Sequence, residues 1–316
     1  MHAATVGSRT RFAPAKVNLA LHIVGQRDDG YHRLESLVVF DETAGDTVMA
    51  SPLVDQPSSD PGAPAQGATD RLSVDGPFAQ SVPLGADNIL LKAAALAREE
   101  FAGFGIDLPP LDIRLSKNLP VAAGIGGGSA DAAALLGLVS ASASEDLRAA
   151  LGEKAVRLGA DVPMCLANRP ALVTGIGETI TPLAGMPKLS MLLVNPGIAV
   201  ETASVFRMLA SRENPAMPSL PGHGFAGLDD LVSFLSECRN DLALAAGSLA
   251  PEIERARGRL IEAGALFARM SGSGATVFGL FADDDARDEA GRRIARDEPG
   301  WWLSRNTDTE TQRTTR

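Results

Sequence analysis

The stretch 119–137, LPVAAGIGGGSADAAALLG, places three consecutive glycines directly before an alanine-rich segment that favours a helix. Glycine loses more backbone entropy on folding than any other residue, so a run of glycines at a helix start needs a compensating role. Two roles fit this pattern. Either the glycines form a tight loop that lets the helix pack closely, or they let backbone N–H groups bind a phosphate at the positive end of the helix.

Two familiar phosphate-binding motifs do not match this stretch. A Walker A loop requires a lysine directly after its last glycine, and none follows Gly128. The dinucleotide fingerprint G-x-G-x-x-G, started at Gly124, ends on Ser129 instead of a glycine. The Ser129 hydroxyl is still a donor for an anion, so residues 120–130 are the candidate phosphate loop.

The composition is that of a globular protein with a large core. The chain has 316 residues, of which 45% are hydrophobic and 22% charged, and this length favours two domains. A net charge of −10 argues against a nucleic-acid partner. Two cysteines are too few for a disulfide framework, and no apolar run approaches the about 20 residues of a membrane span. We therefore expect a cytoplasmic protein with neither a membrane nor a nucleic-acid partner.

The chain before the glycines predicts antiparallel strands and a helix. Residues 13–25, APAKVNLALHIVG, alternate apolar and polar side chains, which predicts a strand with one buried face and with Lys16 and Asn18 on the other. Residues 34–40 and 46–50 predict two further strands, and 51–70, rich in Pro, Ser, Ala and Gly, a surface loop. Asp87 is the expected cap of the helix that follows it.

A change of pattern near residue 185 predicts a domain boundary. We expect domains at 1–185 and 186–302, followed by a polar tail at 303–316. In the second domain, the turn SGSG at 271–274 joins two predicted strands. Its backbone N–H groups bind a substrate phosphate, or the turn only closes the hairpin; the sequence leaves both open.

PVAAGIGGGSA, residues 120–130, resembles the phosphate loop of the GHMP kinases, which phosphorylate galactose, homoserine, mevalonate and related small alcohols. The resemblance runs from Pro14 to Phe281 through the segments 13–40, 86–94, 158–166 and 269–281. The motifs PAKVNL and DGYH narrow it to the members whose alcohol is carried on cytidine diphosphate. Two other functions stay open: a kinase of another alcohol, such as homoserine or mevalonate, and a non-catalytic nucleotide-binding protein.

The resemblance implies an α+β fold with two domains. These are an N-terminal domain like ribosomal protein S5 domain 2 and a C-terminal ferredoxin-like domain, with the active site in the cleft between them. It implies ATP-dependent phosphorylation of the 2-hydroxyl of a cytidine-diphosphate alcohol, in the non-mevalonate route to isoprenoid precursors. Magnesium is expected to arrive with ATP, with Ser129 as its candidate protein ligand and no glutamate ligand identified, and the chain is expected to be a monomer or a homodimer.

Phosphoryl transfer needs a phosphate cradle, a base for the hydroxyl and a nearby cation. By the resemblance, Asp161 is the general base and Lys16 the cation. Pro163 is expected to hold Val162 extended and so to place Asp161 on a short, stiff loop. Without the resemblance, Asp161 reads as a turn cap and Lys16 as a solvent-facing lysine.

The resemblance also assigns the two ligands. Asn88 and Lys117 are expected on the nucleotide side, and the phosphates on Pro120, Val121, Ala122, Ala123, Gly124, Ile125, Gly126, Gly127, Gly128, Ser129 and Ala130. The substrate is expected on Asn18, Tyr31, His32, Thr202 and Phe206. Tyr31 would stack on the cytosine, His32 would hydrogen-bond the base, and Phe206 would form the opposing wall; a tyrosine packed over its turn and a phenylalanine buried by its helix are the structural alternatives.

The chain departs from the GHMP pattern inside the loop. Ala122 and Ala123 stand where glycines are common in the family, and Ala130 stands where a second serine is common. Alanine keeps such a loop tight when its φ is negative. We therefore expect nucleotide binding to survive these replacements.

Overall fold

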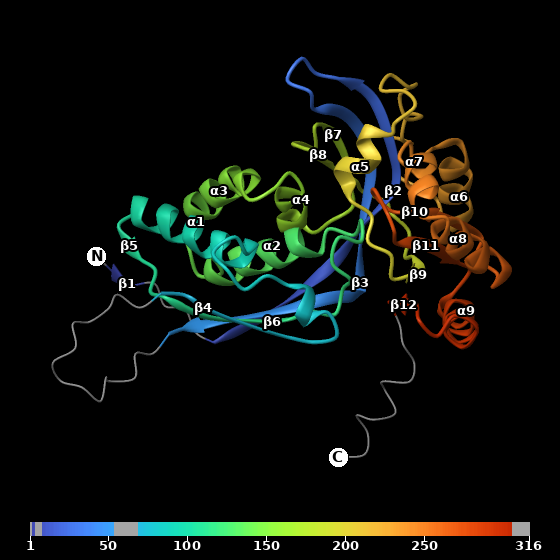
Figure 1. Cartoon of the computed structure of the whole chain (residues 1–316). Coiled ribbons are helices and arrows are strands. Elements are labelled where there is room, and N and C mark those ends of the chain that lie inside the picture. The colour runs from blue at the N-terminus through green and yellow to red at the C-terminus, as the bar shows by residue number, and fades with distance from the viewer. Residues whose placement is uncertain (1, 4–7, 54–68, 305–316) are drawn as a thin grey trace. The chain divides into compact units, whose positions relative to one another are not determined.

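The computed structural model describes residues 2–3, 8–53 and 69–304, and this part of the chain forms two compact units (Figure 1). The first unit contains Met1–Pro14, Gly45–Val121 and Gly127–Ala167. The second unit contains Ala15–Ala44, Ala122–Gly126 and Asn168–Arg316. The greater part of the predicted loop at 51–70 and of the predicted tail at 303–316 lies outside the described residues.

Two long strands supply residues to both units, so the units do not follow the predicted boundary at residue 185. Strand β2 is Arg9–Gln26 and strand β3 is His32–Pro52, and the two pair with each other. The segments 34–40 and 46–50, predicted as separate strands, are both part of β3. Strands usually have about 3–10 residues, so a pattern read over a few residues predicts two short strands where the chain forms one long strand.

Strand β2 is buried on both faces, and the prediction of a single buried face is wrong. Its polar face carries Lys16, Asn18 and His22, whose exposed fractions are 5%, 5% and 0%. Within the second unit, the Lys16 backbone N–H donates to the carbonyl of Ile125, and that of Asn18 to the hydroxyl of Ser271. Other segments therefore cover the face that the alternation assigns to solvent. Buried polar side chains of this kind are more informative about function than exposed apolar ones.

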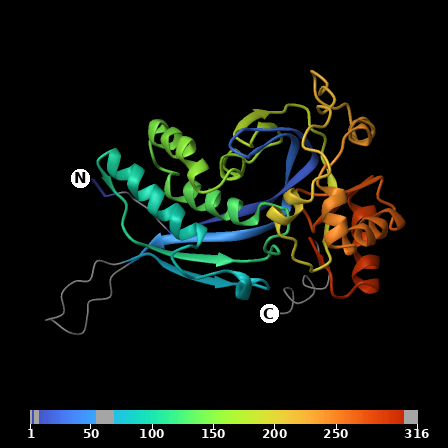
Figure 2. The ribbon, with the colours of Figure 1, turned by 45° about the horizontal axis from the view of Figure 1, so that its top comes forward.

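In the first unit, a layer of helices covers one face of a sheet of order β4-β6-β3 (Figure 2). Strand β4 (Arg71–Asp75) runs parallel to β6 (Leu111–Ser116), which is antiparallel to the last residues of β3. The remaining elements are α1 (Ile89–Gly103), α2 (Gly127–Val139), α3 (Glu145–Lys154), α4 (Val162–Ala167), the short turns η1 (Ala79–Ser81) and η2 (Ala155–Arg157), and a parallel pair β1 (His2–Ala3) and β5 (Ile106–Asp107). Helix α2 packs against α1 and α4 and is buried almost all round, which explains why its sequence is apolar except for Ser129 and Asp131.

The second unit has an antiparallel sheet of order β10-β11-β9-β12. Its strands are β9 (Ser190–Asn195), β10 (Phe267–Met270), β11 (Val277–Phe281) and β12 (Trp302–Leu303). The unit also contains β7 (Ala171–Gly175), β8 (Thr179–Pro182), α5 (Thr202–Arg207), α6 (Leu228–Glu237), α7 (Ala243–Leu249), α8 (Glu252–Glu262) and α9 (Asp284–Asp297). Leu303, predicted to start the tail, pairs with Val194, because its apolar side chain is buried in the sheet.

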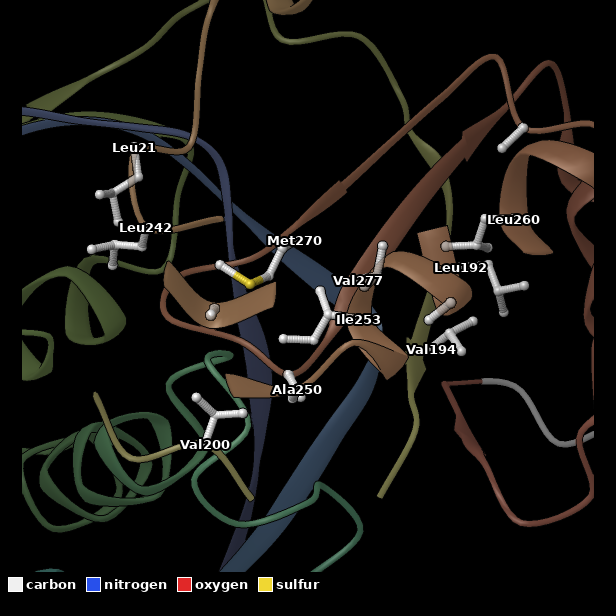
Figure 3. Close-up of a cluster of buried hydrophobic side chains, with 14 of the residues drawn as sticks. Leu21, Leu192, Val194, Val200, Leu242, Ala250, Ile253, Leu260, Met270 and Val277 are labelled. Atoms are coloured by element: carbon white, nitrogen blue, oxygen red, sulfur yellow. The ribbon is translucent and has the colours of Figure 1, made fainter. Parts of the chain in front are cut away.

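Helices α8 and α9 pack on this sheet and close the core of the second unit. Figure 3 shows Ile253 of α8 beside Met270 of β10 and Val277 of β11, within one cluster of buried side chains. Leu21 of β2 belongs to the same cluster. The core therefore holds β2, which carries Lys16 and Asn18, in a fixed place beside the turn 271–274.

Candidate active site

The phosphate-loop residues 120–130 form a tight turn that runs into the first residues of α2. Gly124 and Gly126 have φ values of +73° and +63°, in the left-handed region that favours glycine. Ala122 also has a positive φ, +55°, so the condition of a negative φ, under which alanine keeps the loop tight, does not hold at this position. The left-handed region costs an L-residue roughly 1–2 kcal/mol. The side chains of Ala123, Ile125 and Ala130 are buried, so a ligand would reach only their backbone.

Each of the three consecutive glycines has a different environment. Gly126 has the positive φ, and a Cβ there would lie 3.1 Å from Cβ and from Cε of Lys16. A Cβ on Gly127 would lie 3.1 Å from the Lys117 ammonium. A Cβ on Gly128 would meet only Ile89, at an ordinary 3.9 Å. A methyl group at either of the first two glycines would thus need a neighbouring side chain to shift, whereas one at the third would make an ordinary contact at the start of α2.

This difference predicts opposite effects of the same substitution at neighbouring positions. Gly127→Ala is expected to lower the free energy of unfolding by about 1–3 kcal/mol, because the Lys117 side chain must move. Gly128→Ala is expected to keep it or to raise it by up to about 1 kcal/mol, because alanine favours the helix. Urea unfolding of the two variants beside the native chain measures both effects. Equal destabilisation at the two positions would contradict the prediction.

Lys16 and Asn18 share one face of β2, as predicted, and their side chains are in contact. The Lys16 ammonium donates to Oδ1 of Asn18 at 2.9 Å. The amide of Asn18 donates to the Ser36 hydroxyl at 2.7 Å, which in turn donates to the carbonyl of Ala20. The backbone N–H of Lys16 donates to the carbonyl of Ile125 at 2.9 Å. The second unit therefore brings Lys16 and Asn18 against residues 122–126 of the phosphate loop.

The turn 271–274 holds this part of the phosphate loop. Its Gly274 N–H donates to Ser271 O, so the turn closes the hairpin between β10 and β11, which was one of the two readings of SGSG. The Ser271 hydroxyl accepts from the Asn18 N–H at 3.0 Å and donates to the Gly124 carbonyl at 2.9 Å. A Cβ on Gly124 would lie 2.5 Å from Ser271 O, so the two turns touch through their backbones.

Ser271→Ala is expected to lower the free energy of unfolding by about 1–3 kcal/mol, because it leaves the Asn18 N–H and the Gly124 carbonyl without their shared partner. It is also expected to weaken nucleotide binding, since Gly124 lies in the phosphate loop. Chemical unfolding and nucleotide titration measure the two effects. Ser248→Ala is the matched control, because that exposed hydroxyl bonds only to the Leu244 carbonyl of its own helix. A Ser271 variant as stable as the Ser248 variant would mean that the hydrogen bonds of the Ser271 hydroxyl to Asn18 and Gly124 do not stabilise the fold.

The predicted aromatic residues lie together in the second unit. Tyr31 is 61% exposed and follows a turn in which Gly30 has a φ of +88°. The ring of His32 lies against Phe206 of α5, with centroids 4.9 Å apart and planes at 34°. Thr202 begins the same helix, and its hydroxyl hydrogen-bonds the hydroxyl of Ser273 at 2.8 Å. Phe206 therefore packs on His32, and its expected role as the opposing wall of the cytosine subsite stays a prediction.

The hydrogen bonding and the charge of the His32 ring determine what it can bind. Its Nε2 is buried and has no hydrogen-bond partner among the described residues. Burial, helped by the nearby positive charge of Arg212, lowers the pKa of His32 below its ordinary value, so the ring is neutral at pH 7. A neutral imidazole beside an exposed tyrosine suits recognition of a polar heterocycle.

Asp161 lies in the first unit, directly before α4 (Val162–Ala167). Its carbonyl accepts the N–H of Cys165, so α4 effectively begins at Asp161. The expectation that Pro163 keeps Val162 extended is wrong, because a proline in the first helical turn lacks only an N–H that has no partner inside the helix. A Cβ on Gly159 would lie 4.0 Å from the Ser129 hydroxyl, so the packing of α2 on α4 brings the neighbourhood of Asp161 close to the phosphate-loop serine.

Asn88 and Lys117 both have structural partners in the first unit. Asn88, and not Asp87, caps α1: its side-chain oxygen accepts from the Leu90 N–H, and its amide donates to the Pro83 carbonyl. The Lys117 ammonium donates to Asp46 at 2.5 Å and to Asp131 at 2.7 Å. Asparagine is as good a cap as aspartate, so the sequence does not separate the two residues at 87 and 88.

Sequence reasoning missed Asp46 and Asp131, and it singled out the turn 271–274 without the contact that the Ser271 hydroxyl makes with Gly124. One signal was present for Asp131, which is the only charged residue in the apolar run 119–137. A charged side chain at a buried helix position is rarely there without a partner. Asp46 carried no such signal, because in the sequence it only begins the predicted strand 46–50.

No helix in residues 2–3, 8–53 and 69–304 is long and apolar enough to cross a membrane. The same residues contain no group of three or more His, Cys, Asp and Glu side chains placed to hold a metal ion.

Comparison with known families matches both parts of the chain. The model described as "GHMP kinases N terminal domain" matches residues 88–169. The model described as "GHMP kinases C terminal" matches residues 225–299. The first match contains the phosphate loop and Asp161, and the second contains the turn 271–274.

Comparison with curated proteins and solved structures gives closer relatives. A 4-diphosphocytidyl-2-C-methyl-D-erythritol kinase of Agrobacterium fabrum (strain C58 / ATCC 33970) is 46% identical over 298 residues, which cover 92% of this chain and 93% of the relative. One of Paracoccus denitrificans (strain Pd 1222) is 46% identical over 296 residues, covering 94% and 95%. A crystal structure of 4-(cytidine 5'-diphospho)-2C-methyl-D-erythritol kinase superposes with a TM-score of 0.70 at 30% identity, covering 93% of this chain and 98% of the other.

More distant structures share the fold alone. Homoserine kinase from Cytophaga hutchinsonii superposes with a TM-score of 0.63 at 19% identity, covering 96% of each chain. The identity, coverage and family matches together place the sequence firmly: this chain belongs to the GHMP kinase family, among its 4-diphosphocytidyl-2-C-methyl-D-erythritol kinases.

Proposed function

We propose that this chain transfers the γ-phosphoryl group of ATP to the 2-hydroxyl of 4-diphosphocytidyl-2-C-methyl-D-erythritol, in the synthesis of isoprenoid precursors. The observation that carries the proposal is the 46% identity, over more than nine-tenths of the chain, to relatives that bear the name of this kinase. The local geometry agrees, because Lys16 and Asn18 form one hydrogen-bonded network beside the phosphate loop.

The phosphates of ATP are proposed to bind at residues 120–130. The first N–H groups of α2, from Gly127 onward, have no partner inside the helix and carry its positive dipole end. Gly128 carries no side chain at this turn, which supports close approach of an anion to the backbone. Magnesium is proposed to arrive with ATP, where it would neutralise phosphate charge.

Asp161 is proposed to accept the proton of the substrate hydroxyl as its oxygen attacks the γ-phosphorus, with ADP as the leaving group. Lys16 is proposed to stabilise the negative charge on the attacking oxygen and the transferred phosphoryl group. Asn18 holds the Lys16 ammonium at 2.9 Å, which limits the positions that this cation adopts. Asn88 and Lys117, both engaged in structural contacts, are not given a direct contact with the nucleotide.

The cytosine is proposed to bind beside Tyr31 and His32. Tyr31 has an exposed ring face for stacking, and the neutral ring of His32 has a buried Nε2 available for a hydrogen bond. Phe206 packs against the His32 ring, and Thr202 lies one helical turn before Phe206. The hollow formed by the residues that flank Tyr31 in the sequence is lined by Arg27 and Arg33 together with Asp28 and Asp29, and Arg27 pairs with Asp29 at 2.9 Å, so we assign it no net positive charge.

Tyr31→Ala is expected to raise the KM for the cytidine-diphosphate alcohol about 5- to 150-fold, because stacking of a base on an aromatic ring contributes about 1–3 kcal/mol. The KM for ATP is expected to stay near the native value. Steady-state kinetics with each substrate varied in turn measures both. Phe104→Ala is the control, since this ring is also exposed but ends α1 in the first unit. An unchanged KM for the alcohol would remove Tyr31 from the subsite.

The direct test of the proposed function is a coupled ADP-release assay with ATP, Mg²⁺ and the cytidine-diphosphate alcohol. Homoserine, mevalonate and the free alcohol without cytidine diphosphate serve as competing acceptors. Turnover that needs the cytidine diphosphate supports the proposal. Faster turnover with homoserine or mevalonate would favour another GHMP activity, and ATP binding without turnover would favour a nucleotide-binding protein.

We also propose the fold of each domain and the place of the active site. The order β10-β11-β9-β12, with all neighbours antiparallel and helices between β9 and β10 and between β11 and β12, supports a ferredoxin-like second domain. An N-terminal domain like ribosomal protein S5 domain 2, and an active site in a cleft between the domains, follow from the family resemblance. A cytoplasmic monomer or homodimer without a nucleic-acid partner agrees with the net charge of −10.

A further inference from the structure

The Lys117 ammonium is enclosed by two carboxylates from separate elements of the first unit. Lys117 follows β6, Asp46 lies in β3 and Asp131 lies in α2. Their side chains are 4%, 0% and 3% exposed, and the two N–O distances are 2.5 and 2.7 Å. An ammonium this deeply buried, with two carboxylate partners, offers little surface to a ligand that arrives from solvent.

The same cluster holds the chain on both sides of the phosphate loop. Before the loop, Oδ1 of Asp46 accepts the backbone N–H groups of Asn118 at 2.6 Å and Leu119 at 2.8 Å. After the loop, Asp131 lies four residues beyond Gly127, on the same side of α2. A Cβ on Gly127 would lie 3.1 Å from the Lys117 ammonium and 3.5 Å from Oδ2 of Asp46. The first turn of α2 is therefore seated directly on this ion cluster.

We propose that Asp46 and Asp131 are positioning residues which, through Lys117, fix the first turn of α2 for the nucleotide phosphates, and that Lys117 itself does not touch the nucleotide. The proposal rests on the proposed function, since it assumes that the phosphates bind at this turn. It assigns a role to two carboxylates that the family resemblance did not single out. It also replaces the direct nucleotide contact expected of Lys117.

The charges in the cluster do not balance when both carboxylates are ionised. Two carboxylates share one ammonium, and Oδ1 of Asp131 is buried without a hydrogen-bond partner among the described residues. Burial raises the pKa of Asp131 to about 7, although Lys117 opposes the shift; the negative charge of Asp46 adds to it. Lys117 stays charged, because the two carboxylates outweigh its burial and raise its pKa. Lys117 and Asp46 are the charged groups that face Asp131 among the described residues.

Nucleotide binding changes this balance in a measurable way. Phosphates at the start of α2 add negative charge near Asp131, and a like charge favours the protonated carboxyl. Binding therefore takes up protons near pH 7, and the affinity decreases as the pH rises through the pKa of Asp131. A side chain that only filled space in the helix would give no such proton linkage.

The first experiment titrates the full chain with MgADP by calorimetry at pH 6.5 and 8.0, in two buffers of different ionisation enthalpy. The native chain is expected to take up protons and to bind several-fold more weakly at pH 8.0. Asp131→Asn keeps the shape of the side chain and is expected to lose most of this proton uptake and pH dependence. Asp112→Asn, which changes an aspartate on β6 that pairs with Arg114, is the matched control and is expected to behave like the native chain.

The second experiment separates positioning from direct contact. Asp46→Asn and Lys117→Met are each expected to weaken MgADP binding tenfold or more, and Lys117→Arg to restore part of it. Weak binding in Lys117→Met beside native binding in Asp46→Asn would overturn the proposal, because it would mean that Lys117 itself contacts the nucleotide. Native proton uptake in Asp131→Asn would overturn the role of Asp131.

A readout without nucleotide keeps this proposal distinct from the proposed function. The pKa of Asp131 is higher in the folded chain than in the unfolded chain, so its contribution to stability is present below about pH 4 and is lost as the pH rises to about 7. Urea midpoints of the native chain should therefore decrease from pH 5 to pH 8 by more than those of Asp131→Asn. If the native chain shows this larger decrease but binds no MgADP, the proposed function is overturned and the role of the ion cluster in stability is not. If the urea midpoints of the native chain and of Asp131→Asn change equally with pH, the proposed protonation of Asp131 in the cluster is overturned.

Discussion

Asp161→Asn is expected to lower kcat about 10²–10⁴-fold, the usual contribution of a general base, and to leave the affinity for MgATP nearly unchanged. The amide keeps the size of the carboxylate but does not accept the proton of the substrate hydroxyl. Asparagine caps helices as well as aspartate does, so α4, which begins at this residue, keeps its start. The loss of activity is therefore expected without a loss of folding.

The measurement is single-turnover phosphoryl transfer, with the urea midpoint of the same preparation as the folding check. Asp146→Asn is the matched control, because Asp146 also lies in the first turn of a helix of the first unit. Native kcat in the Asp161 variant would leave the residue as a helix cap only. That outcome would preserve the kinase and remove the base from the proposed mechanism.

The phosphate loop shows how far the sequence predicts this site. The glycine run, the helix after it and the shared face of Lys16 and Asn18 all follow from local pattern, and the structure has each of them. Local pattern also predicts a solvent-facing side for β2, which is wrong. The cover over this side comes from Ile125 and Ser271, which lie more than 100 residues along the chain. Periodicity contains no information on contacts at that separation.

The Lys117 cluster is a second feature that the local sequence does not predict, because its charged residues come from distant positions. Asp46, Lys117 and Asp131 are spread over 86 positions of the sequence and meet only because β3, β6 and α2 are neighbours in the first unit. The family resemblance implies that Lys117 contacts the nucleotide, and it does not indicate which carboxylates bind the Lys117 ammonium. Tertiary structure was needed to find two carboxylates on one ammonium.

The backbone of the loop is a third case. Ala122 adopts a φ of +55° although alanine disfavours positive values, so the neighbouring residues impose this conformation. Thr276 N–H donates to the carbonyl of Ala123 at 3.2 Å, and Lys16 N–H to that of Ile125. These two bonds fix the chain on either side of Gly124. A residue-by-residue preference does not predict a conformation that is held from outside.

Lys16→Met is expected to lower kcat about 10²–10³-fold, because it removes a positive charge from the proposed site of charge development. Methionine fills most of the space of the lysine stem, which packs against Gly126, so folding is expected to survive. Lys92→Met is the control, since Lys92 forms only an exposed pair with Asp87. Lys16→Arg is expected to rescue poorly, because the guanidinium is larger and planar and the space beside Gly126 is tight.

The decisive comparison is the double variant Lys16→Met with Asp161→Asn. The effects of removing residues that act as one catalytic unit are strongly non-additive. The double variant is therefore expected to be little less active than the less active of the two single variants. Losses that multiply would show that the two residues act in separate steps, for example one in substrate binding and the other in proton transfer. Because the comparison uses kcat ratios alone, it tests whether Lys16 and Asp161 serve the same hydroxyl without any assumption about the distance between them.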